Sequence, residues 1–232
     1  MKSTIRSLFL CTAMGAALNV QAVTYSVDPS AAWIGFMNVF NTNGVGGYGA
    51  LGSYVYSSGW GTADLRASFA GPVLTLSANT IGDPNPFWYS PSGGPGSVGN
   101  KIMDASMYVE VGSLPGQTVT FTGEVLANTL SLGPVDANGN GWTSVAFIKD
   151  FAPDYSSFVS TTVALTPGVF SINLNTINDP ARHVQYGFET IGPNVWAGEP
   201  LSFNSITIVP EPTGIALAGL AAALFVIRRR RS

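Results

Sequence analysis

Few residues of this chain have side chains that support covalent chemistry. His183 is the only histidine, and the only cysteine, Cys11, lies in an apolar stretch near the N-terminus. Nucleophilic serine or cysteine sites need an adjacent base, and His183 is the one imidazole available for that role. Alternation along 183–189 places His183 on the polar face of a strand, where an isolated histidine is usually a surface residue. Zinc sites built from several histidines or cysteines are excluded by composition.

Carboxylates remain as possible catalytic groups, because a glycosidase needs only two of them. The glutamates between the two termini are Glu110, Glu124, Glu189 and Glu199. The sequence cannot bring any two of them to the separation that glycoside hydrolysis requires. We therefore expect no catalytic residue and a protein that is not an enzyme, with a glycoside hydrolase as the alternative.

A short polar segment resembles the first half of a calcium-binding loop. Asp136, Asn138 and Asn140 follow the D-x-N-x-N-G pattern, but Phe147 stands where the pattern ends in glutamate. The other interpretation is a hairpin turn, since Asn-Gly is a favoured turn dipeptide. Structural calcium at these three residues is the only cofactor that the sequence suggests.

Aromatic side chains are the better candidates for ligand binding. Sugar rings pack their C–H faces on exposed aromatic rings, although most aromatic residues of a domain belong to its core. Trp88 is flanked by Phe87 and Tyr89 in the Pro/Gly-rich segment 82–100, and three adjacent rings cannot all face one core. Trp60 lies between two glycines. Trp88, Tyr89 and Trp60 are therefore the predicted ligand-binding residues.

The residues between the termini predict an all-β domain. Gly, Pro and Asn interrupt the chain every 8 to 15 residues or so, and several segments alternate apolar and polar side chains. This pattern is typical of antiparallel sheets packed as a sandwich. The segments 41–52 and 82–100 are expected to be loops. About ten strands are predicted, at 32–40, 63–69, 73–78, 102–111, 117–122, 142–148, 158–165, 168–174, 183–189 and 203–209.

The N-terminus has the features of a secretory signal peptide. Lys2 and Arg6 precede the uncharged apolar run from Ser7 to Leu18, and small or apolar residues follow. Signal peptidase is expected to cut after Ala22. Residues 1–22 are thus predicted to be removed, leaving a β-sandwich domain at 23–209.

The C-terminus combines a proline motif, an apolar run and a basic end. Pro210, Glu211 and Pro212 precede the apolar run 214–227, which is shorter than the ~20 residues of a standard membrane-spanning helix. The chain then has four arginines, Arg228, Arg229, Arg230 and Arg231.

This arrangement over 209–231 resembles the PEP-CTERM sorting signal. The resemblance implies a short transmembrane helix within 210–232, transient anchoring in the inner membrane and processing by an exosortase-type membrane enzyme. The protein would then reach the cell surface or the extracellular matrix of a Gram-negative-type bacterium, a setting associated with exopolysaccharide.

The order of features from Gly116 to Ile208 resembles carbohydrate-binding modules of the jelly-roll, galactose-binding-like kind. The resemblance lies in the strand-like segments 117–123, 145–151, 163–166, 184–188, 194–196 and 206–208. It implies a jelly-roll-like antiparallel sandwich and identifies no individual binding residue.

Charge narrows the possible partners. Residues 23–209 contain four lysines and arginines and twelve aspartates and glutamates, which gives a net charge of −8. Nucleic acid is excluded as a partner, because phosphate backbones require clustered basic residues. The sequence thus favours a non-catalytic exported protein that binds or joins an extracellular polysaccharide. The alternative is a purely structural or adhesive matrix protein without a specific ligand.

Overall fold

The computed structural model describes residues 22–42, 51–130, 141–197 and 204–211. This part of the chain consists of β-strands and their connections, which confirms the all-β prediction. The strands are β1 (Ala22–Ser26), β2 (Ile34–Thr42), β3 (Leu51–Trp60), β4 (Ala67–Ala70), β5 (Val73–Ser77), β6 (Thr80–Ile81), β7 (Tyr89–Ser90), β8 (Val98–Gly99), β9 (Lys101–Gly112), β10 (Thr118–Asn128), β11 (Thr143–Phe151), β12 (Phe158–Ala164), β13 (Gly168–Asn175), β14 (His183–Pro193), β15 (Val195–Trp196) and β16 (Ser205–Val209).

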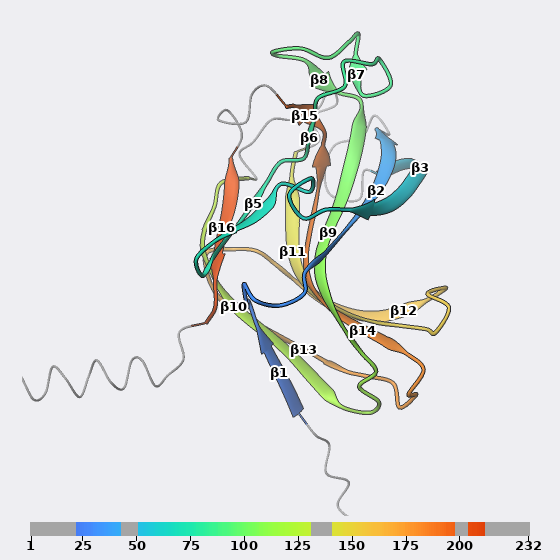
Figure 1. The fold of residues 1–232 in the computed structure, drawn as a ribbon, viewed down its shortest axis with the longest axis vertical. Coiled ribbons are helices and arrows are strands. Elements are labelled where there is room, and N and C mark those ends of the chain that lie inside the picture. Colours follow the sequence, from blue (N-terminus) through green and yellow to red (C-terminus); the bar gives the residue numbers. More distant parts are fainter. Residues whose placement is uncertain (1–21, 43–50, 131–140, 198–203, 212–232) are drawn as a thin grey trace, which may run out of the picture.

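Two six-stranded sheets form the body of the molecule (Figure 1). In the first sheet, the order is β1-β10-β16-β5-β4, and β13 pairs with the other edge of β10. The second sheet has the order β12-β11-β14-β9-β2-β3, with every pair antiparallel. Two small two-stranded sheets, β15-β6 and β7-β8, complete the fold.

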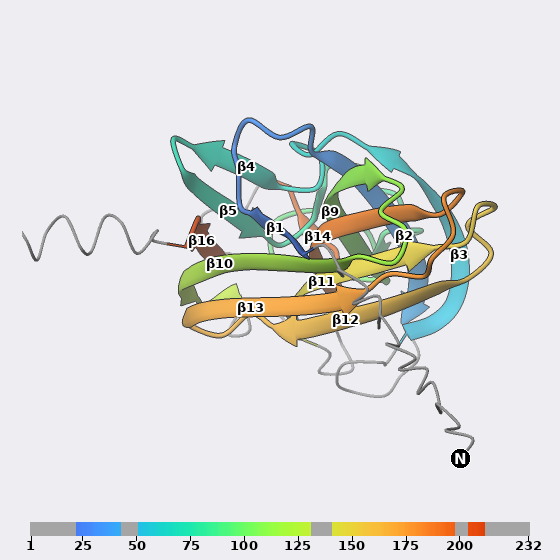
Figure 2. The same cartoon turned by 90° about the horizontal axis from the view of Figure 1, so that it is seen from below.

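The two large sheets pack face to face, as Figure 2 shows from below. Phe121 on β10 contacts Phe188 and Tyr186 on β14, with ring centroids 5.3 and 4.9 Å apart. Aromatic rings from both sheets therefore meet in one core, and such pairs add stability beyond the area that they bury.

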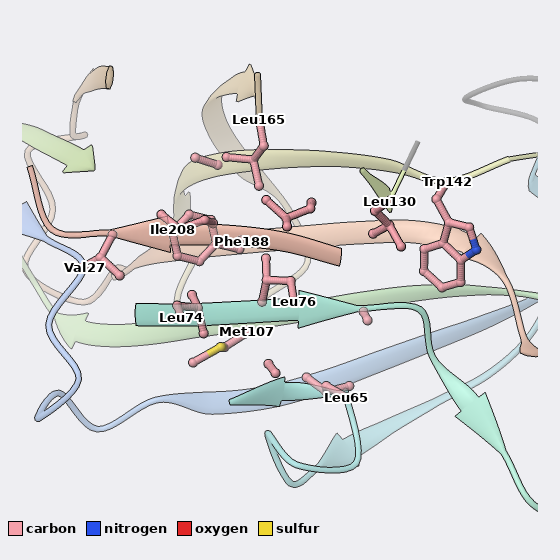
Figure 3. Packing of buried hydrophobic residues seen from close by; sticks show 14 of the residues in the cluster. Val27, Leu65, Leu74, Leu76, Met107, Leu130, Trp142, Leu165, Phe188 and Ile208 are labelled. Carbon is pink, nitrogen blue, oxygen red and sulfur yellow. The ribbon is translucent and has the colours of Figure 1, made fainter. Parts of the chain in front are cut away.

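The core extends along the whole interface and contains side chains from both sheets (Figure 3). Leu74 and Leu76 of β5, Ile208 of β16 and Phe188 of β14 are all buried. Their positions follow from alternation, because every second residue of a strand points to the same face. Phe121, Phe170 and Phe188 are buried, as alternation within the expected strands 117–122, 168–174 and 183–189 requires.

The expectation of purely antiparallel sheets is wrong at two places. β1 runs parallel to β10, with Ala22 opposite Thr118 and Ser26 opposite Thr122. β15 runs parallel to β6. Alternation reveals which face of a strand is buried but carries no information about the direction of its neighbour, so the sequence could not distinguish these pairings.

Several element boundaries also differ from the predictions. The strand expected at 63–69 begins only at Ala67, because residues 61–66 form a turn in which the amides of Asp64 and Leu65 donate to the carbonyl of Gly61. The segment 82–100 contains two short strands rather than an open loop. Residues 51–60, which alternate poorly, form the edge strand β3.

In the described ranges, no helix is long and apolar enough to cross a membrane. The run 214–227, where the transmembrane helix is expected, lies outside those ranges.

Candidate functional site

A groove of about 570 Å³ lies on the outer face of the second sheet, the face turned away from the core. It crosses β2, β9, β14, β11 and the beginning of β12. Its lining combines aromatic, amide, hydroxyl and charged side chains: Phe36, Asn38, Asp104, Ser106, Tyr108, Glu110, Lys149, Phe151, Tyr155, Phe158, Gln185 and Glu189.

Alternation on the central strands explains why these side chains share one face. On β9, Met103, Ala105, Met107 and Val109 are buried in the core, so the residues between them point outward into the groove. The other strands of the sheet follow the same rule. The groove is therefore a consequence of the same pattern that builds the core.

One wall of the groove is aromatic. This wall, formed by Phe151, Tyr155 and Phe158, has ring centroids 5.6 Å apart for Phe151–Tyr155 and 5.0 Å apart for Phe151–Phe158. Tyr155 is 47% exposed and Phe158 is 51% exposed. Large rings that remain open to solvent beside a hollow are a feature of binding surfaces.

Tyr155 lies in the turn between β11 and β12 with a backbone φ of 58°. A bulky residue in this left-handed region is uncommon and costs conformational energy, which the surrounding structure must offset. Asp154 supports the turn by accepting hydrogen bonds from the backbone amide and hydroxyl of Ser156, at 3.1 and 2.7 Å. The strained backbone directs the Tyr155 ring to the groove.

A hydrogen-bond network around Glu110 lies beside this wall. The hydroxyl of Tyr155 donates to Glu110 Oε1 at 3.0 Å, and Gln185 Nε2 donates to Glu110 Oε2 at 2.8 Å. His183 stacks on the Tyr155 ring at 4.6 Å, and its Nδ1 lies 3.5 Å from Glu110 Oε1. The exposed Tyr155 ring is thus held next to the carboxylate of Glu110 and the amide of Gln185. A carboxylate accepts hydrogen bonds from hydroxyl groups, and an amide can both donate to them and accept from them.

A second polar cluster lies farther along the groove from the aromatic wall. Lys149 Nζ donates to Glu189 Oε2 at 2.6 Å and lies 4.2 Å from the centroid of the Phe147 ring. Asn38 Nδ2 donates to Asp104 Oδ2 at 3.1 Å, while the buried Oδ1 of Asp104 has no partner among the described residues. Burial, and then the nearby charge of Glu189, raise the pKa of Asp104 to about 7.

The groove has more acidic than basic groups. Asp104, Glu110 and Glu189 line it together with one lysine, Lys149, which is already paired. In the described ranges, no group of three or more His, Cys, Asp or Glu side chains is placed to hold a metal ion.

The three aromatic residues at 87–89 do not all face the core and differ in exposure. Phe87 is 39% exposed under the ammonium of Lys101, whereas Tyr89 is fully buried with its hydroxyl 2.6 Å from the carbonyl oxygen of Ile81. Trp88 is half-buried and packs on Tyr56 at 6.5 Å. Trp88 and Tyr89 therefore hold this segment on the body of the molecule, and the Tyr89 ring has no face open to a ligand.

Trp60 lies at the end of β3, beside an open hollow of about 500 Å³ that also contains Asp64 and Arg66. Its indole nitrogen donates to Ser58 Oγ at 2.9 Å, and the ring packs partly on the core. The structure thus brings Trp60 to a hollow of its own and does not bring it together with Trp88, Tyr89 or the groove.

The remaining predicted residues lie at or beyond the edges of the described ranges. Asp136, Asn138 and Asn140, the possible calcium ligands, are outside them, as are Pro212 and Arg228–Arg231. Ala22 is the first residue of β1, and Pro210 and Glu211 directly follow β16.

No protein-family model, no curated protein and no solved structure matches this chain.

Sequence reasoning missed the groove, although part of the signal was present. The outward positions of 102–111 and 183–189 could be assigned from alternation, and they include Glu110, Gln185 and Glu189. What the sequence lacked was the register that places β9 beside β14 and β2 beside β9. Tyr155 belongs to a turn, and nothing in the local sequence indicates that its ring reaches a sheet face.

Proposed function

We propose that this protein is an exported surface or matrix protein that binds extracellular polysaccharide in the groove on its second sheet. The observation that carries the proposal is the aromatic wall, where two exposed rings lie beside hydrogen-bonding side chains. Sugars are recognised through this combination, because their C–H faces pack on rings and their hydroxyls need donors and acceptors.

The charge of the groove favours a neutral polysaccharide. Its only lysine is paired with Glu189, and Arg182 is paired with the buried Asp150. No described cation in the groove is thus available for a uronate or sulfate group. An acidic chain would meet the carboxylate of Glu110 and would be repelled, since electrostatic complementarity governs partner choice.

The proposal includes the export route and the finer class of the fold. Removal of residues 1–22, sorting by an exosortase-type enzyme and delivery to the envelope rest on the terminal motifs of the sequence. A jelly-roll-like sandwich is supported by the two six-stranded sheets.

Titration of neutral oligosaccharides into the purified protein tests the binding proposal. Cello-, xylo-, laminari- and manno-hexaose should include at least one ligand, and Tyr155→Ala should weaken its binding by ~10-fold or more through loss of the exposed ring. Tyr54→Ala is the matched control, because Tyr54 is 58% exposed on β3 and does not line the groove.

If none of these oligosaccharides binds, the groove proposal fails. The structural or adhesive alternative would then be favoured by retention of the protein at the cell surface or by self-association without sugar specificity. Equal loss of binding in the Tyr54 and Tyr155 variants would also remove the groove as the site.

A further inference from the structure

Two carboxylates of the groove lie on neighbouring strands. Asp104 on β9 is opposite Ile191 of β14, and Glu189 is two residues from Ile191 on the same outer face. Diagonal neighbours of this kind are roughly 7–8 Å apart at the backbone. Glycosidases that use one carboxyl group as acid and the other as base on a water molecule hold them roughly 6.5–9.5 Å apart, a separation that side chains on such diagonal positions can reach.

The two carboxylates have different environments. Lys149 Nζ donates to Glu189 Oε2 at 2.6 Å, while Oε1 of Glu189 has no hydrogen bond among the described residues. Asp104 is more deeply enclosed, and burial followed by the charge of Glu189 raises its pKa to about 7. The hydrogen bond from Asn38 and the positive charge of Lys149 lower the pKa of Asp104, but by less than burial and Glu189 raise it. Near neutral pH, one group can therefore donate a proton while the other accepts one.

We infer that the groove hydrolyses glycosidic bonds of a neutral polysaccharide, with Asp104 as the general acid and Glu189 as the general base. The inference rests on the proposed function, because the chain must first bind in the groove. It departs from the expectation of a non-catalytic protein, since that expectation came from the inability of the sequence to pair any two carboxylates.

The reaction consumes one water molecule for each bond cleaved. Asp104 gives its proton to the glycosidic oxygen while the bond between that oxygen and the anomeric carbon breaks. Glu189 takes a proton from a water molecule, whose oxygen forms the new bond to the anomeric carbon. The proton on Glu189 then returns to Asp104 through solvent, which leaves two shorter chains and an unchanged protein.

Glu110 is too far away to take part in this pair. It lies six positions from Asp104 along β9, which corresponds to roughly 20 Å in an extended strand. Its bonds from Tyr155 and Gln185 tie it instead to the aromatic wall. The groove therefore has an aromatic end suited to holding a sugar ring, and the Asp104–Glu189 pair lies farther along it, where it would cleave the chain.

Incubation of the full purified chain with the four neutral hexaoses, labelled at the reducing end, tests the inference. We expect shorter labelled products, with a rate that falls above pH 7 as Asp104 loses its proton. Asp104→Asn and Glu189→Gln should each reduce the rate ~100-fold or more while binding of the same hexaose persists. Glu124→Gln, on the first sheet, is the control and should leave the rate unchanged.

The outcomes separate this inference from the proposed function. A hexaose that binds but gives no shorter product overturns the hydrolysis and leaves the binding proposal standing. Failure of all four hexaoses to bind overturns both. Equal product formation by the Asp104→Asn variant and the unaltered protein also overturns the hydrolysis, because the activity would then come from elsewhere.

Discussion

Asp104 combines two properties that are seldom found together on a sheet surface. It faces a groove, yet one of its carboxylate oxygens is shielded from solvent without a hydrogen-bond partner among the described residues. Its neighbours in the groove are Asn38, Lys149 and Glu189. A catalytic role is one explanation for a buried polar group without a partner, and together with the position of Asp104 in the groove it makes this residue central to the inferred activity.

The raised pKa of Asp104 predicts a pH-dependent effect on stability. The folded protein holds the proton up to about pH 7, whereas the unfolded chain releases it near the ordinary value of 3.8. Unfolding between these pH values therefore releases a proton, and the contribution of Asp104 to stability falls as the pH rises through this range. Asp104→Asn should be more stable than the unaltered protein at pH 8, by on the order of 2 kcal/mol.

Thermal melting at pH 4 and pH 8 checks this expectation. At pH 4 the aspartate and the asparagine are both uncharged, so the difference in Tm should shrink. A difference in Tm that is the same at both pH values would contradict the assignment of a raised pKa to Asp104.

Gly187 shows how closely β14 and β9 approach. A Cβ at this position would lie 2.1 Å from the carbonyl oxygen of Met107 and 2.6 Å from the Cα of Tyr108. Because both contacts are with backbone, no side chain can rotate away. Gly187→Ala should therefore destabilise the protein by about 1–3 kcal/mol in denaturant titration. Gly59→Ala is the control, since a Cβ there meets nothing within 4 Å, and a larger loss in that variant would disprove the packing argument.

Residue-level prediction from the sequence succeeded where a side chain obeys the alternation of its own strand. The inward directions of Phe121 and Phe188 were predictable in this way. Trp88 and Tyr89 were chosen because they lie in a Pro/Gly-rich segment, but composition does not show that such a segment folds back on the body. The place of Tyr155 in the groove could not be predicted either, because the direction of its ring depends on a strained turn between β11 and β12.

At the scale of elements, the connection between β13 and β14 is fastened to β11 by one buried carboxylate. Asp150 is fully buried, accepts from the backbone amide of Ile177 at 2.8 Å and pairs with Arg182 Nε at 2.9 Å. Arg182 also donates to the Asp150 carbonyl at 2.7 Å. A segment without regular structure is thereby fixed beside the strand that leads into the groove.

Removing this carboxylate should be costly. Asp150→Ala leaves the guanidinium of Arg182 and the amide of Ile177 without their partner, which predicts a loss of about 3–5 kcal/mol of stability. Urea titration measures it, and Asp64→Ala is the control because Asp64 is exposed at a turn. A urea midpoint for Asp150→Ala close to that of Asp64→Ala would show that the contacts of Asp150 with Ile177 and Arg182 contribute little to stability.

The strands that were missed share a physical cause. β3 is an edge strand whose serines and glycines leave much of it exposed, so it has little apolar periodicity to detect. β1 joins its sheet through parallel pairing with β10, a contact almost a hundred positions away in the sequence. Strands that gain their stability from distant partners leave weak local signals. The buried central strands β9 and β14 were predicted, β9 to within a residue at each end, whereas β14 continues four residues beyond the predicted 183–189.

At the scale of the whole molecule, stability rests on side-chain packing between the two large sheets and on hydrogen bonds between strands within each sheet. The described ranges contain no cysteine, so no disulfide joins the strands there. The all-β class was predictable because turn residues and alternation recur along the whole segment between the two termini. The order of strands in each sheet was not predictable, because it depends on which edges meet when the sheets close over a common core.

The N-terminal strand gives a test of the expected export that does not disturb the core. Ala22 is exposed at the start of β1, so Ala22→Arg should leave the fold intact while blocking cleavage by signal peptidase, which requires a small residue before the cut. We expect mass spectrometry of the protein from expressing cells to show an N-terminus at Val23 for the unaltered chain and the uncleaved leader for the variant. Ser26→Arg, at the other end of β1, is the control and should be cleaved normally. Identical N-termini in the Ala22→Arg variant and the unaltered chain would contradict cleavage at this site.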